Sequence, residues 1–257
     1  MTDLAQVAAK AQVEKGKPSL RDMVQAQAPQ IEAQLAGALN SGAFVRAVLS
    51  EIQKTPALQQ ASPQSVLGSI MLAAQLKLEV GSALGHFYLT PRKDRGEQIC
   101  LPIIGYQGLI ELAYRSGQIS KVETFLIREG DVFEYGADSR HGMRYEWRPK
   151  DMDDARPWTG VIASASRTTG GDPIWAYLTR DKVLARRPAG WERGPWKSHE
   201  EEMARKTAVR DLAPYLPKST EFAQAVQAQR QVEEGGARIE ARAGVDELIV
   251  LDGADRG

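Results

Sequence analysis

Short apolar segments separated by glycine, proline and aspartate occupy the middle of the chain, and this pattern restricts the fold more than any other feature. Four of them, at 118–131, 143–150, 158–167 and 173–180, have the length and composition of β-strands and are bounded by turn residues. In the second segment apolar and charged residues alternate, as expected for an antiparallel sheet with one face in water. The sequence therefore predicts an antiparallel sheet.

Helical patterns precede these strands. Residues 43–54 carry apolar side chains at helical spacing, and a second helix is predicted over 62–78, with Ser62 as its N-cap and Pro63 as its first residue. We expect the two helices to form a packed antiparallel pair.

A hairpin and a short helix are predicted between the helical pair and the sheet. Segments 86–92 and 98–105 indicate two strands joined by a polar turn, and the helix after them ends at Gly117, which suits a left-handed residue past a helix end. The chain is thus expected to be an α+β protein, with an N-terminal helical pair, an antiparallel hairpin and sheet with packed helices, and flexible termini.

Composition suggests three segments along the chain. Residues 1–35 are rich in Ala, Gln and Lys and indicate a flexible arm with some helical tendency, 36–220 form the core, and 221–257 form an acidic, mostly disordered tail. Basic residues outnumber acidic ones from 175 to 218, and the sign reverses in the tail. Net charge is zero over the whole chain, so any attraction to a polyanion must come from local segregation of charge.

Several classes of protein do not fit the sequence. The single cysteine, Cys100, excludes an intrachain disulfide and fits a reducing compartment. Charges interrupt every apolar run at the N-terminus, and no stretch is long and apolar enough to span a bilayer. We therefore expect a cytoplasmic protein without a membrane partner.

The glycine-rich stretch 81–108 does not form an ATPase phosphate loop. Gly85 is followed by His86 and Phe87, so the required spacing and the lysine are both missing. The turn "GYQG" at 105–108 has two interpretations. It is either an anion site at a helix start, with an aromatic ring for base stacking, or simply a tight turn between a strand and a helix.

The last helix, predicted over 198–213, carries the strongest local signal. Ser198 and Glu201 have the spacing of a capping box. One side of the helix is apolar, and Arg205, Lys206 and Arg210 lie on the other side. These cations either form salt bridges with glutamates one turn earlier, or contact successive phosphates of a single strand.

Other candidate groups also have two interpretations. Trp175 and Tyr177 share a strand face, where they either stack on bases or pack against a helix. The basic loop 186–193 fits a polyanion or a neighbouring subunit. The carboxylates at 151–154 favour a metal-dependent nuclease only weakly, and the three histidines have no partner at zinc-ligand spacing.

Four long segments, "LEVGSALGHFYLTP", "IIGYQGLIELAYRSGQI", "REGDVFEY" and "GPWKSHEEEMARKTAVRDLAPYLP", resemble the RecT family of phage and prophage recombinases, which are single-strand annealing proteins. The resemblance covers about 30–225. It implies a β-β-β-α core, ATP-independent annealing of complementary DNA strands, assembly into rings or helical filaments, and a phage exonuclease as partner. It implies no enzymatic activity, no cofactor and no catalytic metal, with Mg²⁺ acting at most on DNA charge.

The resemblance favours a DNA-contact role for Lys206 and Arg210, which fall in the family's "GPW...H..EM..KTA.R" segment. Many relatives carry a basic residue in the "GYRG" turn, where this chain has Gln107, so the turn should contribute less salt sensitivity. The alternatives are a metal-dependent nuclease and a scaffold that does not bind DNA. The residues predicted to bind DNA are Gly105, Tyr106, Gln107, Gly108, Arg115, Arg180, Lys182, Arg186, Arg187, Trp191, Lys197, Arg205, Lys206 and Arg210.

Overall fold

The computed structural model of the chain describes residues 18–81, 84–138, 142–151, 155–188, 190, 192, 195–217, 219–235, 238–241 and 248–251. They form two compact units. The first unit runs to Gly105 and takes up the chain again at Gln227, and the second comprises Tyr106–Val226. The segment 36–220, expected from composition to be one core, is therefore divided between two units.

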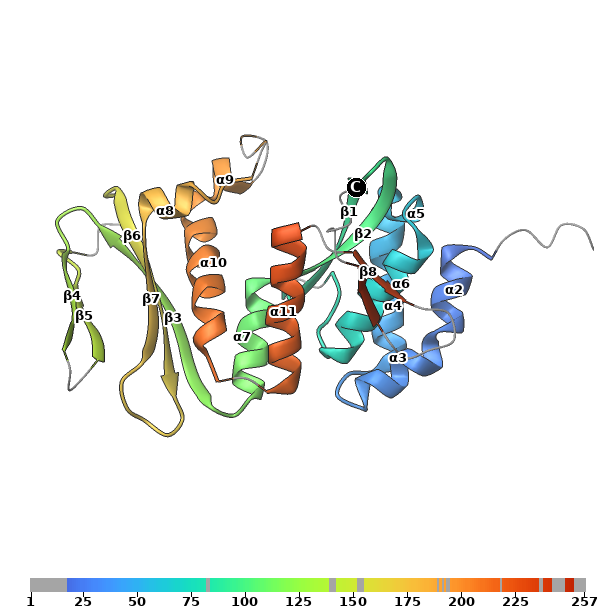
Figure 1. The fold of residues 1–257 in the computed structure, drawn as a ribbon, viewed down its shortest axis with the longest axis horizontal. Helices are drawn as coiled ribbons and strands as arrows, with labels where there is room; N and C mark the ends of the chain where they lie inside the picture. The colour runs from blue at the N-terminus through green and yellow to red at the C-terminus, as the bar shows by residue number, and fades with distance from the viewer. Residues whose placement is uncertain are drawn as a thin grey trace, which may run out of the picture. The chain divides into compact units, whose positions relative to one another are not determined.

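Helices form most of the first unit (Figure 1). Their bounds are α2 Leu20–Ala26, α3 Ala28–Leu35, α4 Ser41–Lys54, α5 Pro56–Gln59 and α6 Pro63–Gln75. The predicted helices at 43–54 and 62–78 correspond to α4 and α6, and α2 and α3 pack against both. Pro63 is the first residue of α6, as predicted, although the side chain of Ser62 makes no capping hydrogen bond.

Residues 20–35 form two packed helices, which corrects the flexible arm expected from composition. Ser19 and Asp22 form a capping box at the start of α2, and Val24, Ile31 and Leu35 are fully buried. Three well-placed apolar residues are enough to dock these short helices. The sparse hydrophobicity of the segment obscured this arrangement.

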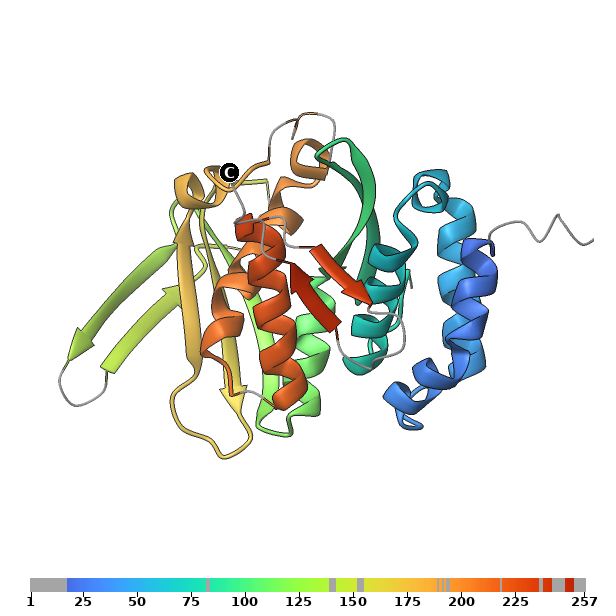
Figure 2. The ribbon, with the colours of Figure 1, turned by 45° about the vertical axis from the view of Figure 1, so that its right-hand side comes forward.

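The predicted hairpin is present as β1 Phe87–Asp94 and β2 Glu97–Ile104, paired antiparallel beside α6 (Figures 1 and 2). Arg95 and Gly96 form its two-residue turn, and both have positive φ, as a tight hairpin requires. The Ser65 hydroxyl of α6 accepts a hydrogen bond of 2.9 Å from the Cys100 amide, which fixes the helix against the hairpin.

The second unit is built on a three-stranded antiparallel sheet in the order β3-β6-β7. Its elements are α7 Tyr106–Arg115, β3 Ile119–Arg128, β4 Val132–Asp138, β5 Gly142–Arg148, β6 Trp158–Arg167, β7 Ile174–Thr179, α8 Arg180–Leu184, α9 Pro195–Ser198, α10 Glu200–Leu212, η2 Ala213–Tyr215 and the start of α11 Thr220–Gly235. Strands β3, β6 and β7 followed by α10 give the β-β-β-α order implied by the family resemblance. Strand β4 was missed in the sequence, where its residues were left out of the strand pattern.

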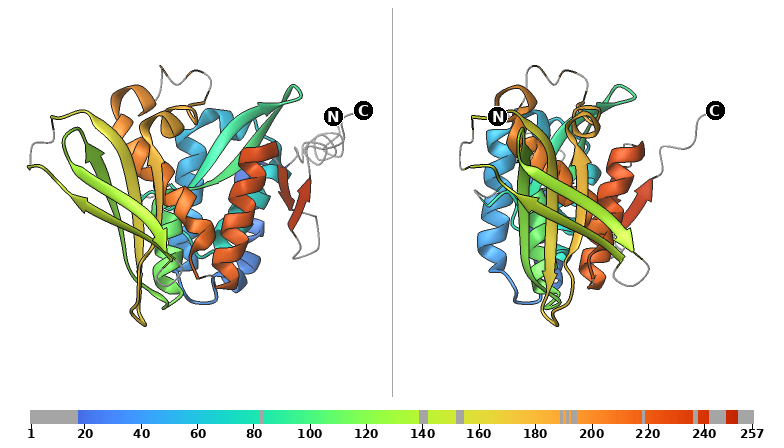
Figure 3. Two further views of the ribbon diagram at one scale, coloured as in Figure 1. Left: turned by 60° about the vertical axis from the view of Figure 1, so that its left-hand side comes forward. Right: turned by 90° about the vertical axis from the view of Figure 1, so that its left-hand side faces the viewer.

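The two faces of this sheet are covered by different elements. Helix α10 packs on one face, where Val161, Ala163 and Ala165 of β6 are fully buried. The β4–β5 hairpin lies on the other side of the sheet from α10 (Figures 1 and 3). The α+β class is confirmed, with the sheet as the middle layer of the second unit.

The segment 221–257, expected to be a mostly disordered tail, contains ordered elements. Helix α11 buries Phe222, Ala225 and Val226. Strands β8 Arg238–Ala241 and β9 Leu248–Leu251 form an antiparallel pair within the first unit. The acidic composition concealed a periodic apolar face in α11.

Within the part of the chain that the structure describes, every helix is too short or too polar to cross a bilayer.

Candidate nucleic-acid interface

Helix α10 directs two cations away from the sheet. Ala204 and Ala208 are fully buried against it, and Lys206 and Arg210 each follow one of these alanines by two residues. Two residues turn a helix by about 200°, so both cations lie on the side roughly opposite to the buried alanines. The buried half of the amphipathic pattern predicted from the sequence is confirmed, whereas Lys206 and Arg210 on the other half are half-buried and Val209 beside them is buried.

These two cations are destabilised in their charged state. The pKa of Lys206 is lowered first by desolvation and then by repulsion from Arg210. The pKa of Arg210 is lowered by desolvation and by repulsion from Arg186. Within the described residues Lys206 has no carboxylate partner. The charge of Lys206 therefore lacks the compensation that a nearby carboxylate would provide.

The salt bridges predicted along α10 are not formed, which corrects the helix-internal interpretation of its charges. Glu201 pairs with Arg128 of β3 instead of Arg205, through two bonds of 2.9 and 3.0 Å. Arg205 donates to the Thr124 carbonyl at 3.0 Å. Arg205 is thus tied to the backbone of the sheet.

The predicted capping box at Ser198 is also wrong. The helical conformation is interrupted between α9 and α10. His199 is the N-cap of α10, and its side chain makes no capping hydrogen bond. The hydroxyl of Ser198 instead lies 2.7 Å from the Nδ1 atom of His199. Glu201 is unavailable to the cap because it is held by Arg128.

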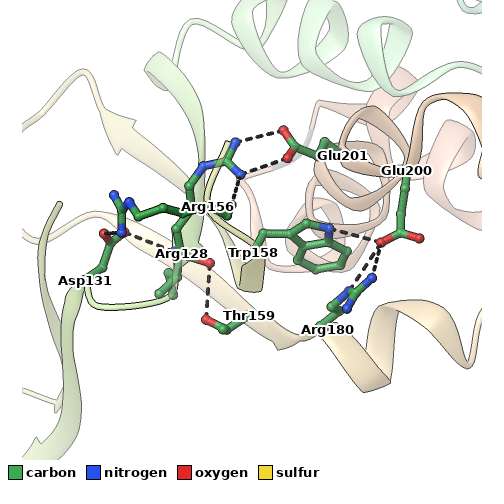
Figure 4. A network of polar contacts seen from close by, with 9 residues as sticks. Arg128, Asp131, Arg156, Trp158, Thr159, Arg180, Glu200 and Glu201 are labelled. Carbon is green, nitrogen blue, oxygen red and sulfur yellow. Dashed lines mark hydrogen bonds and ion pairs between the residues drawn. The ribbon is translucent and has the colours of Figure 1, made fainter. Parts of the chain in front are cut away.

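The Glu200 carboxylate binds two arginines that were predicted to contact DNA, Arg180 and Arg187. The carboxylate accepts hydrogen bonds from Arg180 Nη2 at 2.9 Å and from the indole of Trp158 at 3.1 Å. Arg187 also pairs with it. Figure 4 shows Arg180 and Trp158 directed at Glu200, and Arg128 directed at Glu201. The basic segment after β7 is therefore partly neutralised within the unit.

The other cations predicted to contact DNA differ in whether they form an ion pair. Arg186 forms a 2.8 Å ion pair with Asp211, and Arg115 forms a 3.2 Å pair with Glu111. Lys182 and Lys197 extend into solvent and form no ion pair with another described residue. Trp191 lies outside the described residues.

Gly105 of the "GYQG" turn has a structural explanation. A Cβ atom on Gly105 would collide with the backbone carbonyl oxygen of Gly85, and the Gly105 amide donates 2.9 Å to the carbonyl of His86. This close approach favours the tight-turn interpretation for Gly105. Tyr106 and Gly108 are partly or fully buried in α7 and Gln107 is exposed, and their DNA contacts stay predictions.

Trp175 and Tyr177 are covered by other aromatic rings. The Tyr177 ring lies 4.7 Å from Phe133, and the Trp175 ring lies 4.9 Å from Tyr145, measured between centroids. Burial, the favoured alternative for this pair, is thus supported, although the β4–β5 hairpin and not a helix provides the cover.

An ion-pair network around Asp131 was missed by sequence reasoning. Burial raises the pKa of this carboxyl, but hydrogen bonds from the Arg128 and Lys150 amides, Arg156 and Trp147 outweigh it and hold the pKa well below its ordinary value. The only sequence signal for this network was the spacing of Arg128 and Asp131, which are three residues apart with Gly130 between them. The network locks the β3–β4 turn to the end of β5.

A nuclease-type metal centre finds no support in the described residues. They contain no group of three or more His, Cys, Asp and Glu side chains that could hold a metal ion. Asp151 pairs with Arg156 at 3.0 Å, and the rest of the acidic run at 152–154 lies outside the described residues.

The fold and this site define an α+β protein in which a sheet supports a helix with outward cations. Comparison with known proteins gives the family. The RecT family model matches residues 42–242, and the chain belongs to the RecT family of recombinases. Protein RecT of Escherichia coli (strain K12) is 41% identical over 210 residues, covering 77% of this chain and 76% of that protein.

A second relative matches a shorter region. The uncharacterized protein YqaK of Bacillus subtilis (strain 168) is 33% identical over 89 residues, which cover 35% of this chain and 30% of that protein. The resemblance noted from the sequence is confirmed.

Proposed function

We propose that this chain binds single-stranded DNA along the outer side of α10 and anneals complementary strands without nucleotide hydrolysis. The carrying observation is the pair Lys206 and Arg210 on one side of α10, whose charges are desolvated, with Lys206 repelled by Arg210 and Arg210 repelled by Arg186. One helical turn separates them by roughly 6 Å, which is close to the spacing of successive phosphates in a single strand. Membership of the RecT family supports the same role.

Annealing requires no bond chemistry, so no catalytic group is needed. The protein holds the phosphates while the bases remain free to pair with a second strand. We therefore propose a non-enzymatic protein without a cofactor, in which Mg²⁺ acts on DNA charge only. Its proposed location is the cytoplasm, where the DNA is found.

Many copies are proposed to act together on one strand. The few phosphate contacts of one copy give weak binding, and neighbouring copies on the same strand add their contacts. The zero net charge of the chain removes long-range repulsion between copies. We propose a ring or helical filament, with a phage exonuclease supplying the single strand.

The test mixes labelled complementary oligonucleotides with the protein, without nucleotide, and follows duplex yield and strand length. The variant K206A/R210A is expected to bind roughly tenfold more weakly. The slope of log affinity against log salt should fall by about 1.4, because each lost phosphate contact on a single strand removes about 0.7.

A matched control is K121A/R148A, which also removes one lysine and one arginine from the second unit. Both residues form exposed ion pairs, with Glu123 at 2.6 Å and Glu146 at 3.1 Å. This control should keep the wild-type salt slope. Shortening of the strands on adding Mg²⁺ would favour a nuclease, and absence of binding at low salt would favour a scaffold.

A further inference from the structure

Resting on the proposed function, we propose that Glu200 is a positioning residue for DNA binding. Its carboxylate holds Arg180 and Arg187, so that these two arginines fix the start of α10 and do not contact phosphate. The sequence alone assigns both arginines to the DNA-binding set. The structure divides the cations near α10 into anchoring arginines and outward cations.

Three side chains donate hydrogen bonds to the Glu200 carboxylate. Arg180 donates to one carboxylate oxygen through Nε at 3.3 Å and Nη2 at 2.9 Å, and the Trp158 indole donates to the same oxygen at 3.1 Å. Arg187 donates to the other oxygen. The Arg180 guanidinium also lies over the Trp158 ring, 5.3 Å from its centroid, which restricts its direction further (Figure 4).

Burial of Trp158, Arg187 and Glu200 makes their contacts costly to open. Trp158 is 5% exposed, and the side chains of Arg187 and Glu200 are 16% and 24% exposed, whereas that of Arg180 is 45% exposed. Moving the arginines to a phosphate would leave the carboxylate with one indole donor in a partly desolvated place. The exchange replaces existing pairs with new ones and gains little, so DNA should leave the cluster intact.

The cluster lies where α10 needs external support. His199 gives the helix no side-chain cap, and Glu200 and Glu201 are its first two residues. They are held by β6 through Trp158, by α8 through Arg180, and by β3 through Arg128. Negative charge at this helix end is favourable in its own right. The start of α10 is thereby attached to three elements of the second unit.

The outward cations depend on this attachment. At 1.5 Å per residue, Lys206 and Arg210 lie roughly 9 and 15 Å along the axis from Glu200. A change in the tilt or rotation of α10 at its start alters the direction of both side chains. Glu200 therefore acts on DNA binding through Lys206 and Arg210.

The experiment measures single-strand affinity as a function of salt for the full chain and the variants E200Q, R180A, R180K and K206A. We expect E200Q and R180A to lower the affinity about threefold or more at every salt concentration. Their salt slopes should equal that of the wild type, whereas K206A should lower the slope by about 0.7. R180K should behave like R180A, because a lysine cannot reproduce the two donors that meet Glu200.

The matched control is E202Q, which removes the same charge from the exposed neighbour Glu202. A general electrostatic effect would make E200Q and E202Q alike, and both would bind DNA more tightly. The double variant R180A/E200Q should be no weaker than either single variant, since both changes remove the same cluster.

Three results would overturn the inference. They are a lower salt slope in R180A, tighter binding by E200Q, and full affinity in R180K. Only the molecules that bind DNA determine the slope of log affinity against log salt, so partial unfolding of a variant does not change the slope. If the wild type itself fails to bind oligonucleotides at low salt, the proposed function fails; if it binds and only R180A behaves as a phosphate contact, this inference alone fails.

Discussion

The ion pair between Arg128 and Glu201 should contribute measurably to the stability of the second unit. Arg128 is 7% exposed, and its guanidinium makes two bonds of 2.9 and 3.0 Å to Glu201. A third bond of 2.7 Å goes to the carbonyl of Arg156. Replacing Glu201 with alanine leaves a buried guanidinium that keeps this carbonyl bond.

The magnitude follows from the burial of the two partners. Removing one partner of a fully buried pair costs about 3–5 kcal/mol. The Glu201 side chain is 38% exposed, so water can reach the vacated position and replace part of the lost interaction. We therefore expect a loss of about 1.5–2.5 kcal/mol, or about 6–10 °C in the melting temperature for a unit of this size.

The assay is urea and thermal unfolding followed by tryptophan fluorescence. All 5 tryptophans lie within the second unit, so the signal reports on that unit. The control is Glu202→Ala, an exposed neighbour on the same helical turn, which should change stability by no more than about 0.5 kcal/mol.

A second comparison separates the lost pair from the stranded charge. Arg128→Met combined with Glu201→Ala should be more stable than Glu201→Ala alone, because the buried charge that has lost the Glu201 carboxylate is then removed. Equal stability of the Glu201 and Glu202 variants would refute the reasoning, since the ion pair would then contribute nothing.

Three further predictions concern single side chains. Because the pKa of Lys206 is lowered in the folded protein, binding a phosphate should raise it, so DNA binding at alkaline pH takes up protons; titration calorimetry in two buffers of different ionisation enthalpy measures this uptake. In Gly160→Ala the new Cβ would lie 2.6 Å from the Tyr177 ring, and unfolding should show a loss of about 1–3 kcal/mol. The pKa of Asp131 is lowered by its hydrogen bonds, so its stabilisation is complete above the ordinary value of 3.8 and is lost as pH falls below it; acid unfolding of Asp131→Asn should lack that part of the pH dependence.

Local patterns predicted those elements whose structure depends on neighbouring residues. Helices α4 and α6, the β1–β2 hairpin and α7 follow from periodicity and turn residues, and Gly117 has the expected positive φ of 70°. The family resemblance added the β-β-β-α order. Strand β4 was missed because its residues Val132–Asp138 include a glycine and follow directly on the turn that ends the preceding strand.

Short segments were misjudged where their stability depends on a distant surface. Residues 20–35 have few apolar side chains, yet Val24, Ile31 and Leu35 are fully buried in the first unit. Composition measures the average polarity of a segment, whereas docking depends on where its few apolar residues point. The same reason applies to Phe222 in α11, within a segment of acidic composition.

By itself the sequence determined that Lys206 and Arg210 share the polar side of α10, because a helix repeats every 3.6 residues whatever surrounds it. Only the tertiary structure decided which charges are paired. Glu201 prefers Arg128, 73 residues away in the chain, to Arg205 one turn along the helix. A rigid, partly buried partner brought close by the sheet binds a carboxylate better than a solvated neighbour, and no local pattern contains the path that brings it there.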